Sequence, residues 1–358
     1  MNIIELSYVI PAYNASRTIK ICVESIKASM LFSPEISYEI IVIDNNSTDN
    51  TPDILSALDI ILIVEKKQGR SYARNSGLRR SKGKYVAFID ADVYLRPLWA
   101  KNLIALFNKE NVGGVQGKII PCKEHGSKSL NEYRFWAIGH DTKSSFCLPR
   151  VKASESPMIN SAACLYLKKA LLEVDGFNVH LERHEDIDLA KRVFLSGYNL
   201  ASSESAEAMV IFHGDGWWDY FKRSFADGFY KYKYTYRWAE YYTASGLPHV
   251  NQNKKPASTL LNQARYYLGK AFEEEEFFWF VKIGLMLFNA AGRISGMIWY
   301  KINNYHLKRL QTFKLVSSSA PQFIFFDDGH YQINLANNEL LDFTHNLPAN
   351  KITDESLK

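Results

Sequence analysis

Lys84-Tyr-Val-Ala-Phe-Ile-Asp-Ala-Asp92 is the stretch of sequence on which the fold prediction rests. Its apolar residues 85–89 are rich in β-formers and lie between Gly83 and Asp90, which predicts a buried strand. Residues i and i+2 of an extended chain point to the same side, so Asp90 and Asp92 converge just beyond that strand. Ligands bind at this edge of open α/β sheets, and paired carboxylates suit a hard divalent cation such as Mg²⁺ or Mn²⁺. The alternative is a strand that ends in a polar turn, where Asp is common.

Strand and helix patterns alternate along the first hundred residues. Short apolar runs predict strands at residues 6–11, 39–44, 60–64 and 85–89. Helical spacing of apolar residues, or a proline near a helix start, predicts helices at residues 17–30, 51–58 and 71–80. Such alternation is typical of parallel strands with helices on both faces. We therefore expect an α/β fold with a mostly parallel sheet.

The composition indicates a folded protein with a full core: the chain has 358 residues, of which 47% are hydrophobic. Its net charge of +5 suits anionic substrates or a membrane surface and does not require nucleic acid as a partner. The four cysteines have no metal-ligand spacing, which favours reduced thiols in a cytoplasmic protein. Residues 1–11 contain no signal-peptide pattern and run directly into a strand pattern.

Polar side chains follow each predicted strand at the point where the strand ends. The four segments are Pro11-Ala-Tyr-Asn14, Asp44-Asn-Asn-Ser-Thr-Asp49, Gly69-Arg-Ser-Tyr-Ala-Arg-Asn-Ser-Gly77 and Asp90-Ala-Asp92. Each alone has an alternative reading as a turn or a helix cap. Because the carboxyl ends of parallel strands lie at one edge of a sheet, the four together indicate a binding site there.

These segments, in this order, resemble the family 2 glycosyltransferases of the GT-A fold, bacterial type. The likeness continues through residues 160–169, Gly176-Phe177, His184-Glu-Asp-Ile-Asp-Leu-Ala-Lys-Arg192 and Gly197-Tyr198, which are similar to the acceptor half of that family. It covers roughly residues 5–230. The resemblance implies a GT-A, Rossmann-like nucleotide-binding sheet with an acceptor-side subdomain, followed here by a helical C-terminal extension.

The resemblance also implies a nucleotide-sugar donor site in the first half of the chain. Tyr13 would offer an aromatic face to the base, and Arg74 would supply charge to the nucleotide. Asp92 would ligate Mn²⁺ or Mg²⁺ bridging the diphosphate, with Asp90 on the metal or the ribose, and the cation would neutralise the leaving nucleoside diphosphate. The full set expected to hold the nucleotide sugar is Pro11, Tyr13, Asn14, Asp44, Arg70, Arg74, Asn75 and Asp90.

Two acids are expected at the start of a helix over residues 186–196. The residues alone favour helix caps, because acids at a helix start stabilise its dipole. The resemblance implies instead that Asp186 is the general base, which deprotonates the acceptor hydroxyl and gives inversion, with Glu185 in a supporting role at the acceptor. Asp188 is expected to be structural. His213 follows an apolar run, and the resemblance offers it as a further metal ligand beside a structural alternative.

The composition changes near residue 217. Residues 217–242 are crowded with aromatic and basic side chains, which fits a packed amphipathic helix, an acceptor groove or a membrane-interface belt. The apolar run 277–300 carries Lys282 and Arg293, so we expect an interfacial or buried helical hairpin, with Gly292 and Gly296 allowing close approach. We expect a catalytic domain at 1–230 (nucleotide-sugar half 1–110, acceptor half 111–230), a helical, membrane-associating region at 231–312, and a tail at 313–358 without an assigned role.

The sequence leaves two classes of function. The favoured one is a metal-dependent inverting hexosyltransferase that moves a sugar, UDP-linked by preference, to a hydroxyl of a glycan, glycolipid or other acceptor in cell-surface glycan assembly. The expected place is the cytoplasm, or the cytoplasmic face of the inner membrane. The alternative is a non-catalytic sugar-nucleotide- or glycan-binding relative of the same fold. A binding protein needs no general base, so Asp186 beside Asp44, Asp90 and Asp92 favours the enzyme.

Overall fold

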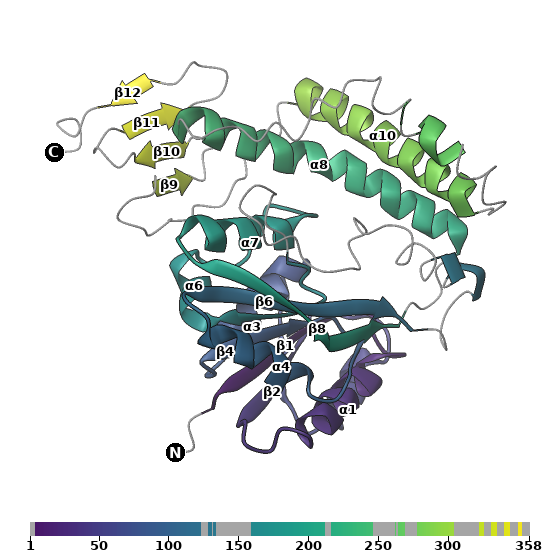
Figure 1. Cartoon of the computed structure of the whole chain (residues 1–358), viewed down its shortest axis with the longest axis vertical. Helices are drawn as coiled ribbons and strands as arrows, with labels where there is room; N and C mark the ends of the chain where they lie inside the picture. Colours follow the sequence, from purple (N-terminus) through teal and green to yellow (C-terminus); the bar gives the residue numbers. More distant parts are fainter. Residues whose placement is uncertain are drawn as a thin grey trace.

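The four expected strands form the parallel half of one sheet in a computed structural model of the chain (Figure 1). They are β1 (Leu6–Ala12), β2 (Tyr38–Asp44), β3 (Ile61–Val64) and β4 (Tyr85–Ile89). The order β3-β2-β1-β4 is parallel throughout, and Ala12 pairs with Asp44, which pairs with Val64. The expected helices are α1 (Ile19–Met30), α2 (Thr51–Ser56) and α3 (Arg70–Arg80). The carboxyl ends of all four strands therefore meet at one edge.

The structure describes residues 4–122, 128–130, 132–133, 159–211, 216–245, 262, 264–268, 278–303, 322–325, 331–334, 340–343 and 350–352. Beyond β4, the sheet continues with strands that the sequence analysis did not separate, and the helix expected at residues 186–196 is among the elements that accompany them. These elements are β5 (Val93–Leu95), α4 (Trp99–Ile104), the short 3₁₀ helix η1 (Ala105–Asn108), β6 (Val112–Pro121), β7 (Ala163–Leu167), α6 (Lys168–Glu173), α7 (Glu185–Leu195) and β8 (Asn199–Val210). The sheet order is β3-β2-β1-β4-β7-β6-β8-β5, with β7 antiparallel to both β4 and β6. The sheet is thus mixed, and parallel pairs predominate.

Alternate side chains of the strands build a hydrophobic core on each face of the sheet. On β1, Tyr8 and Ile10 point to the layer formed by α1 and α4, whereas Val9 points to the layer of α3, α6 and α7. This two-layer packing follows from the period of two in a strand. Trp99 of α4 and Phe88 of β4 are fully buried, one in each layer. The sheet edge that carries the polar loops is consequently held by packing on both sides.

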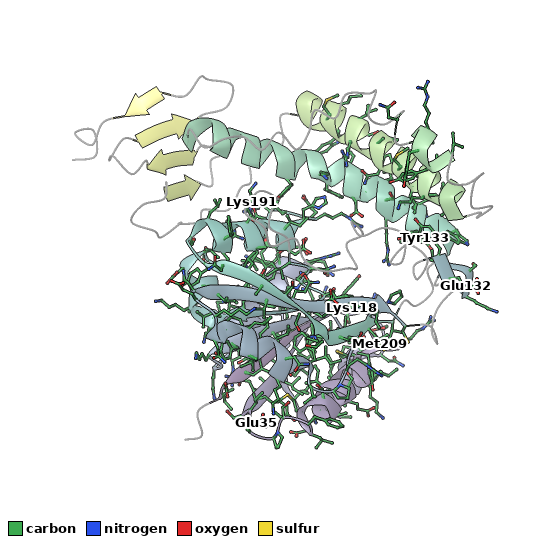
Figure 2. The ribbon with its side chains drawn as sticks, in the orientation of Figure 1. Glu35, Lys118, Glu132, Tyr133, Lys191 and Met209 are labelled. Atoms are coloured by element: carbon green, nitrogen blue, oxygen red, sulfur yellow. The ribbon has the colours of Figure 1, made fainter. Side chains whose placement is uncertain are left out.

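Two long helices lie across one side of the eight-stranded sheet. Figure 1 shows α8 (Trp217–Ser245) passing over α7, with α10 (Phe278–Asn303) on its far side. The pair is joined by polar contacts: Ser224 Oγ donates to the Leu285 carbonyl at 2.8 Å, and Asn289 Nδ2 donates to the Ser224 carbonyl at 2.9 Å. At one end of the hairpin the Tyr133 ring packs 5.6 Å from that of Trp217 (Figure 2).

Glycines allow α8 and α10 to pack backbone to backbone. A Cβ atom on Gly292 or Gly296 would overlap the backbone carbonyl of Phe225 or Phe229, and one on Gly228 would overlap that of Asn289. Close approach at Gly292 and Gly296 is therefore confirmed. The division of the chain at residue 230 stays a prediction, and that residue lies inside α8.

A small antiparallel sheet lies near the C-terminus. Its strands are β9 (Gln322–Phe325), β10 (Tyr331–Asn334), β11 (Leu340–Phe343) and β12 (Asn350–Ile352). They pair in the order β12-β11-β10-β9. All four strands lie within the segment 313–358, to which the sequence analysis assigned no role. None of these strands reaches the sheet that carries the polar loops.

We predict that Gly292→Ala separates α10 from α8. The new methyl group meets a backbone carbonyl that cannot rotate away, and overpacking of this kind costs about 1–3 kcal/mol. Gly284→Ala is the matched control, because its Cβ would meet only the Phe221 ring, and both variants share the gain of about 1 kcal/mol in helix propensity. Hydrogen exchange of the α10 amides should accelerate in Gly292→Ala relative to Gly284→Ala. Equal protection in the two variants would show that the backbone contact is not tight.

Candidate active site

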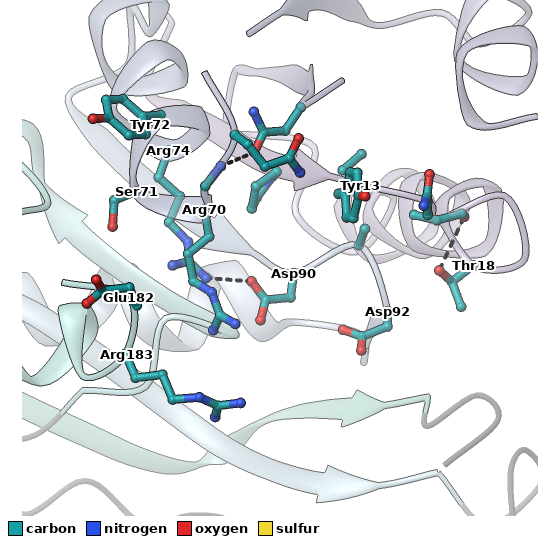
Figure 3. A pocket seen from close by; sticks show the side chains of 18 of the residues that line it. Tyr13, Thr18, Arg70, Ser71, Tyr72, Arg74, Asp90, Asp92, Glu182 and Arg183 are labelled. Atoms are coloured by element: carbon teal, nitrogen blue, oxygen red, sulfur yellow. Dashed lines mark hydrogen bonds and ion pairs between the residues drawn. The ribbon is translucent and has the colours of Figure 1, made fainter. Parts of the chain in front are cut away.

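A cavity of about 1170 Å³ opens at the carboxyl edge of the parallel strands. One wall is formed by the loops after β1 and β2 and by the start of α3, and Asp90 and Asp92 lie beyond β4 (Figure 3). The other wall comes from the segment before α7, from Ile211 and from Arg223 of α8. The edge predicted from the strand ends is therefore hollowed, as a binding site requires.

The loops after β1 and β2 are tied together beside this cavity. The Asn14 side-chain carbonyl accepts a hydrogen bond from the Thr48 amide at 2.8 Å, and the Asn14 amide donates to Ser47 Oγ at 3.0 Å. Asn14 has a φ of 49°, a left-handed conformation that Asn tolerates better than most residues. Pro11, Tyr13 and Asn14 all line the cavity, and Tyr13 is 52% exposed. Tyr13 therefore presents an open aromatic ring on this wall.

Asn45 holds the loop that leads into α3. Its Nδ2 donates to the carbonyls of Glu65 at 3.0 Å and Lys67 at 2.7 Å, and its Oδ1 accepts from the Gly69 amide at 2.8 Å. Gly69 has a φ of 136°, which glycine adopts without steric cost. Asn45 lines the cavity and was not singled out from the sequence, although it directly follows Asp44 in the second polar segment. The amino end of α3 is thereby presented to the cavity.

Two residues of the predicted nucleotide set are not among the residues that line the cavity. Asp44 is 5% exposed, and its Oδ1 accepts from the Ser47 amide at 3.3 Å. Asn75 is 8% exposed. Its Nδ2 donates to the Phe177 carbonyl and its Oδ1 accepts from the Phe177 amide, both at 2.8 Å. Asp44 thus supports its own loop, and Asn75 fastens α3 to the chain before α7. Their nucleotide roles stay predictions.

Arg74 joins the two halves of the site. It is buried, with Nη2 2.7 Å from Asp90 Oδ1 and Nη1 3.0 Å from Glu185 Oε1. Arg70 Nη1 lies 3.6 Å from the same Glu185 oxygen. Burial alone would lower the pKa of Arg74, but the charges of Asp90 and Glu185 outweigh it and raise the pKa. Arg70, Arg74 and Asp90 all line the cavity, whereas Glu185 lies behind the two arginines as their common counter-ion.

The carboxylates of Asp90 and Asp92 share one part of the cavity wall (Figure 3). Their combined field is felt by the buried Cys22 thiol, whose pKa is raised by burial first and then by Asp92 and Asp90. In the described parts of the chain no group of three or more His, Cys, Asp and Glu side chains converges to hold a metal. Mg²⁺ is commonly bound by one or two carboxylates together with phosphate oxygens and water. The pair therefore fits a cation that arrives with a diphosphate; His213 lies outside the described residues.

Asp186 lies at the start of α7, next to Glu185, and does not line the cavity itself. Burial raises the pKa of Asp186 to about 7, helped by the neighbouring Glu185 charge and opposed by the Ile187 amide and by Arg74 and Arg70. An acid with this pKa exchanges a proton near neutral pH, which suits general acid–base work. Because the folded state binds the proton more tightly than the unfolded state, this group lowers stability as pH rises from about 4 to about 7.

The segment before α7 is anchored to α8. Arg183 Nη1 lies 2.5 Å from Asp227 Oδ1, and His184 Nε2 lies 3.1 Å from the Asp227 carbonyl. Burial lowers the pKa of His184, and its ring packs 5.7 Å from that of Tyr234. Arg183 and Arg223 line the cavity and were missed in the sequence, because nothing in the local pattern indicates which charged residues of a loop or helix face a cavity.

Comparisons with known proteins agree with this fold. Residues 7–174 match the family described as "Glycosyl transferase family 2". "Glycosyltransferase AglE" of Haloferax volcanii is 27% identical over 54% of this chain and 63% of its own length, less than two thirds of that relative. "Glycosyltransferase GlyG" of Streptococcus pneumoniae is 27% identical over 61% of this chain and 71% of its own.

Among solved structures, the mannosyltransferase PcManGT from Pyrobaculum calidifontis, in complex with GDP-Man and Mn²⁺, is similar with a TM-score of 0.56 and 16% identity. The match covers 82% of this chain and 87% of that one. At this identity the likeness concerns the fold, and it confirms the expected GT-A architecture with its helical C-terminal part.

We predict that Glu185→Gln lowers the pKa of Asp186. The substitution removes the negative charge that raises this pKa and leaves Arg74 and Arg70 to act on Asp186. Carboxyl ¹³C NMR titration, assigned with Asp186→Asn, measures the change. Glu182→Gln is the control, since Glu182 lines the cavity but is not a cause of the Asp186 shift. An unchanged pKa in Glu185→Gln would mean that burial alone sets the value.

Proposed function

The chain belongs to the glycosyl transferase family 2 through residues 7–174, and on that premise we propose that it is an inverting, metal-dependent glycosyltransferase. The donor would be a nucleoside-diphosphate sugar, with UDP-sugars the first to test, and the acceptor a hydroxyl of a glycan, glycolipid or other molecule in surface-glycan assembly. The observation that carries this proposal is the Arg74 bridge, because it places the helix with Asp186 beside the wall with Asp90 and Asp92.

In this proposal the nucleoside occupies the wall with Tyr13, Asn14 and the start of α3. The base stacks on the exposed Tyr13 ring, and Arg70 stands near the diphosphate. Asp92, with Asp90, would hold the divalent cation, which when bound neutralises the leaving nucleoside diphosphate. Arg74 keeps Asp90 in one orientation through the 2.7 Å ion pair. Asp186 removes the proton from the attacking hydroxyl, a role that its pKa of about 7 supports.

The alternative, a protein that binds sugar nucleotides without catalysis, is less favoured by the same residues. A binding site needs the cavity and the nucleotide wall, but gains nothing from a carboxyl group held at a pKa of about 7. Arg74 and Glu185 also form a buried, charged network between two segments of the chain. An apolar contact would hold the same segments together at a lower cost in desolvation free energy.

We predict that wild-type protein releases nucleoside diphosphate from a UDP- or GDP-sugar with Mn²⁺ or Mg²⁺, and that Asp92→Asn or excess chelator abolishes the release. Asp186→Asn should keep the thermal midpoint and the affinity for nucleotide, while turnover falls by about 10²–10⁴, the usual contribution of a positioned base. Asp53→Asn is the control, because Asp53 lies in the first turn of α2 as Asp186 does in α7, and outside the cavity.

Three results would decide against parts of this proposal. Full activity in excess chelator would show that the reaction does not depend on a metal ion. Near wild-type turnover of a folded Asp186→Asn protein would leave Asp186 as a helix cap and make Glu185 the next residue to test. Tight nucleotide binding with no turnover on any donor would favour the non-catalytic alternative.

We also propose that α10 rests on the surface of an anionic membrane. Val281–Trp299 is long and apolar enough to cross a bilayer, yet only 17% of that window is buried in the protein. Its outward side carries Leu287, Ile294 and Ile298, which are 51%, 57% and 49% exposed. Lys282 and Arg293 make a full span costly and suit anionic headgroups instead.

We predict that Ile294→Asp reduces flotation of the protein with anionic liposomes at least tenfold, since losing a large apolar contact is worth about 1.5–3 kcal/mol. Added salt should weaken binding of the wild type. Leu172→Asp is the control, because Leu172 of α6 is similarly exposed at 57% but lies on the catalytic domain. If Ile294→Asp instead dissociates a dimer and leaves flotation unchanged, the outward side of α10 binds a second copy of the chain and not a membrane.

A further inference from the structure

Two arginines lie on the cavity wall opposite the nucleotide-side loops. Arg183 comes from the segment before α7, and Arg223 comes from α8; both line the cavity. In Figure 3, Arg183 lies on the opposite side of Asp90 and Asp92 from Tyr13. The remaining lining residues of this wall are Val179, Leu181, Glu182 and Ile211, so its formal charge is positive.

Arg183 is held in position rather than left to swing in solvent. Its side chain is 27% exposed, and Asp227 of α8 engages Nη1 at 2.5 Å. A guanidinium has five N–H donors in a fixed plane, so one carboxylate contact orients the group and leaves other donors for a ligand. Arg223 lies on α8 one helical turn before Asp227, on the same side of the helix, because residues four apart are neighbours on a helix surface. α8 thus contributes one arginine and orients the other.

Neutral sugar hydroxyls do not require guanidinium groups, whereas phosphate oxygens match them in charge and geometry. The donor diphosphate is already provided for at Asp90 and Asp92, through a cation, and at Arg70. We propose that Arg183 and Arg223 form a subsite for a phosphate group of the acceptor, so that the acceptor is a phosphate-bearing molecule. This inference rests on the proposed function and adds the chemical class of its second substrate.

The phosphate can belong to a soluble molecule or to a lipid headgroup. α8 contacts the cavity through Arg223, and it packs through Ser224, Phe225 and Gly228 on α10. α10 carries the exposed apolar residues on its outward side. A lipid lying against the hairpin could therefore present its headgroup to the same arginines, and the experiment has to separate the two sources.

The test uses the full chain with saturating Mn²⁺, titrated with UDP and GDP and then, with the tighter nucleotide bound, with sn-glycerol 1-phosphate or glycerol. A second arm uses phosphatidylcholine vesicles with and without phosphatidic acid. The variants are Arg183→Gln, Arg223→Gln and Arg183→Lys, which keeps the charge. Lys222→Gln is the matched control, because Lys222 neighbours Arg223, pairs with Asp219 at 3.2 Å and does not line the cavity. Thermal midpoints verify that each variant folds.

We expect glycerol phosphate, but not glycerol, to bind without displacing nucleotide, and to bind about tenfold more weakly to each Gln variant, with partial recovery in Arg183→Lys. Lys222→Gln should match the wild type. The same pattern with phosphatidic acid vesicles alone would support a lipid source. Binding that is equal in all variants, competition between glycerol phosphate and nucleotide, or no phosphate binding in either arm would overturn the subsite. Failure of UDP and GDP to bind would count against the proposed function. In that case the binding of glycerol phosphate to the wild type and to the arginine variants would be compared with Mn²⁺ alone, without nucleotide.

Discussion

The ion pairs of Arg74 with Asp90 and Glu185 are the interaction on which the site depends. They join residues 16 and 111 positions apart, from the turn after β4, from α3 and from α7, through a single buried guanidinium. Taking away one partner of a buried charge pair costs about 3–5 kcal/mol, since the other charge is left without compensation. Among the described residues the other cation at Glu185 is Arg70, which is 53% exposed, so the buried Arg74 is the main contact that sets the approach of α7 to the end of β4. The Phe177 ring, 5.2 Å from the guanidinium, covers this pair from the apolar side.

The same network separates the properties of two adjacent acids. Glu185 is engaged by Arg74 and Arg70 and serves as their counter-ion. Asp186 receives the field of Glu185 and the cost of burial, and its pKa rises to about 7. A carboxyl group whose environment raises its pKa toward neutrality is a recurrent arrangement in sites of proton transfer. In this protein burial is the largest cause of the shift at Asp186, so the shift depends on how the turn into α7 packs and not on the residue type.

Helix α8 connects the catalytic sheet with the C-terminal hairpin. On one side Asp227 binds Arg183 and His184, immediately before the acid pair, and Arg223 reaches the cavity. On the other side glycines bring α10 into backbone contact. The segment that carries Arg183 and His184, immediately before Glu185 and Asp186, is therefore joined through α8 to α10. The hairpin is better regarded as part of the site than as a separate appendage.

Local sequence pattern determined the parallel half of the sheet: β1 to β4 and α1 to α3 lie where that pattern placed them, within two residues at every end. Local pattern also placed Asp90 and Asp92 at the ligand-binding edge, because the end of a strand is a local property. It could not indicate that β7 pairs antiparallel with β4, that Asn75 turns to Phe177, or that Arg183 and Arg223 face the cavity. These features depend on which distant segments meet, and burial, charge pairing and pKa exist only once those segments are in contact.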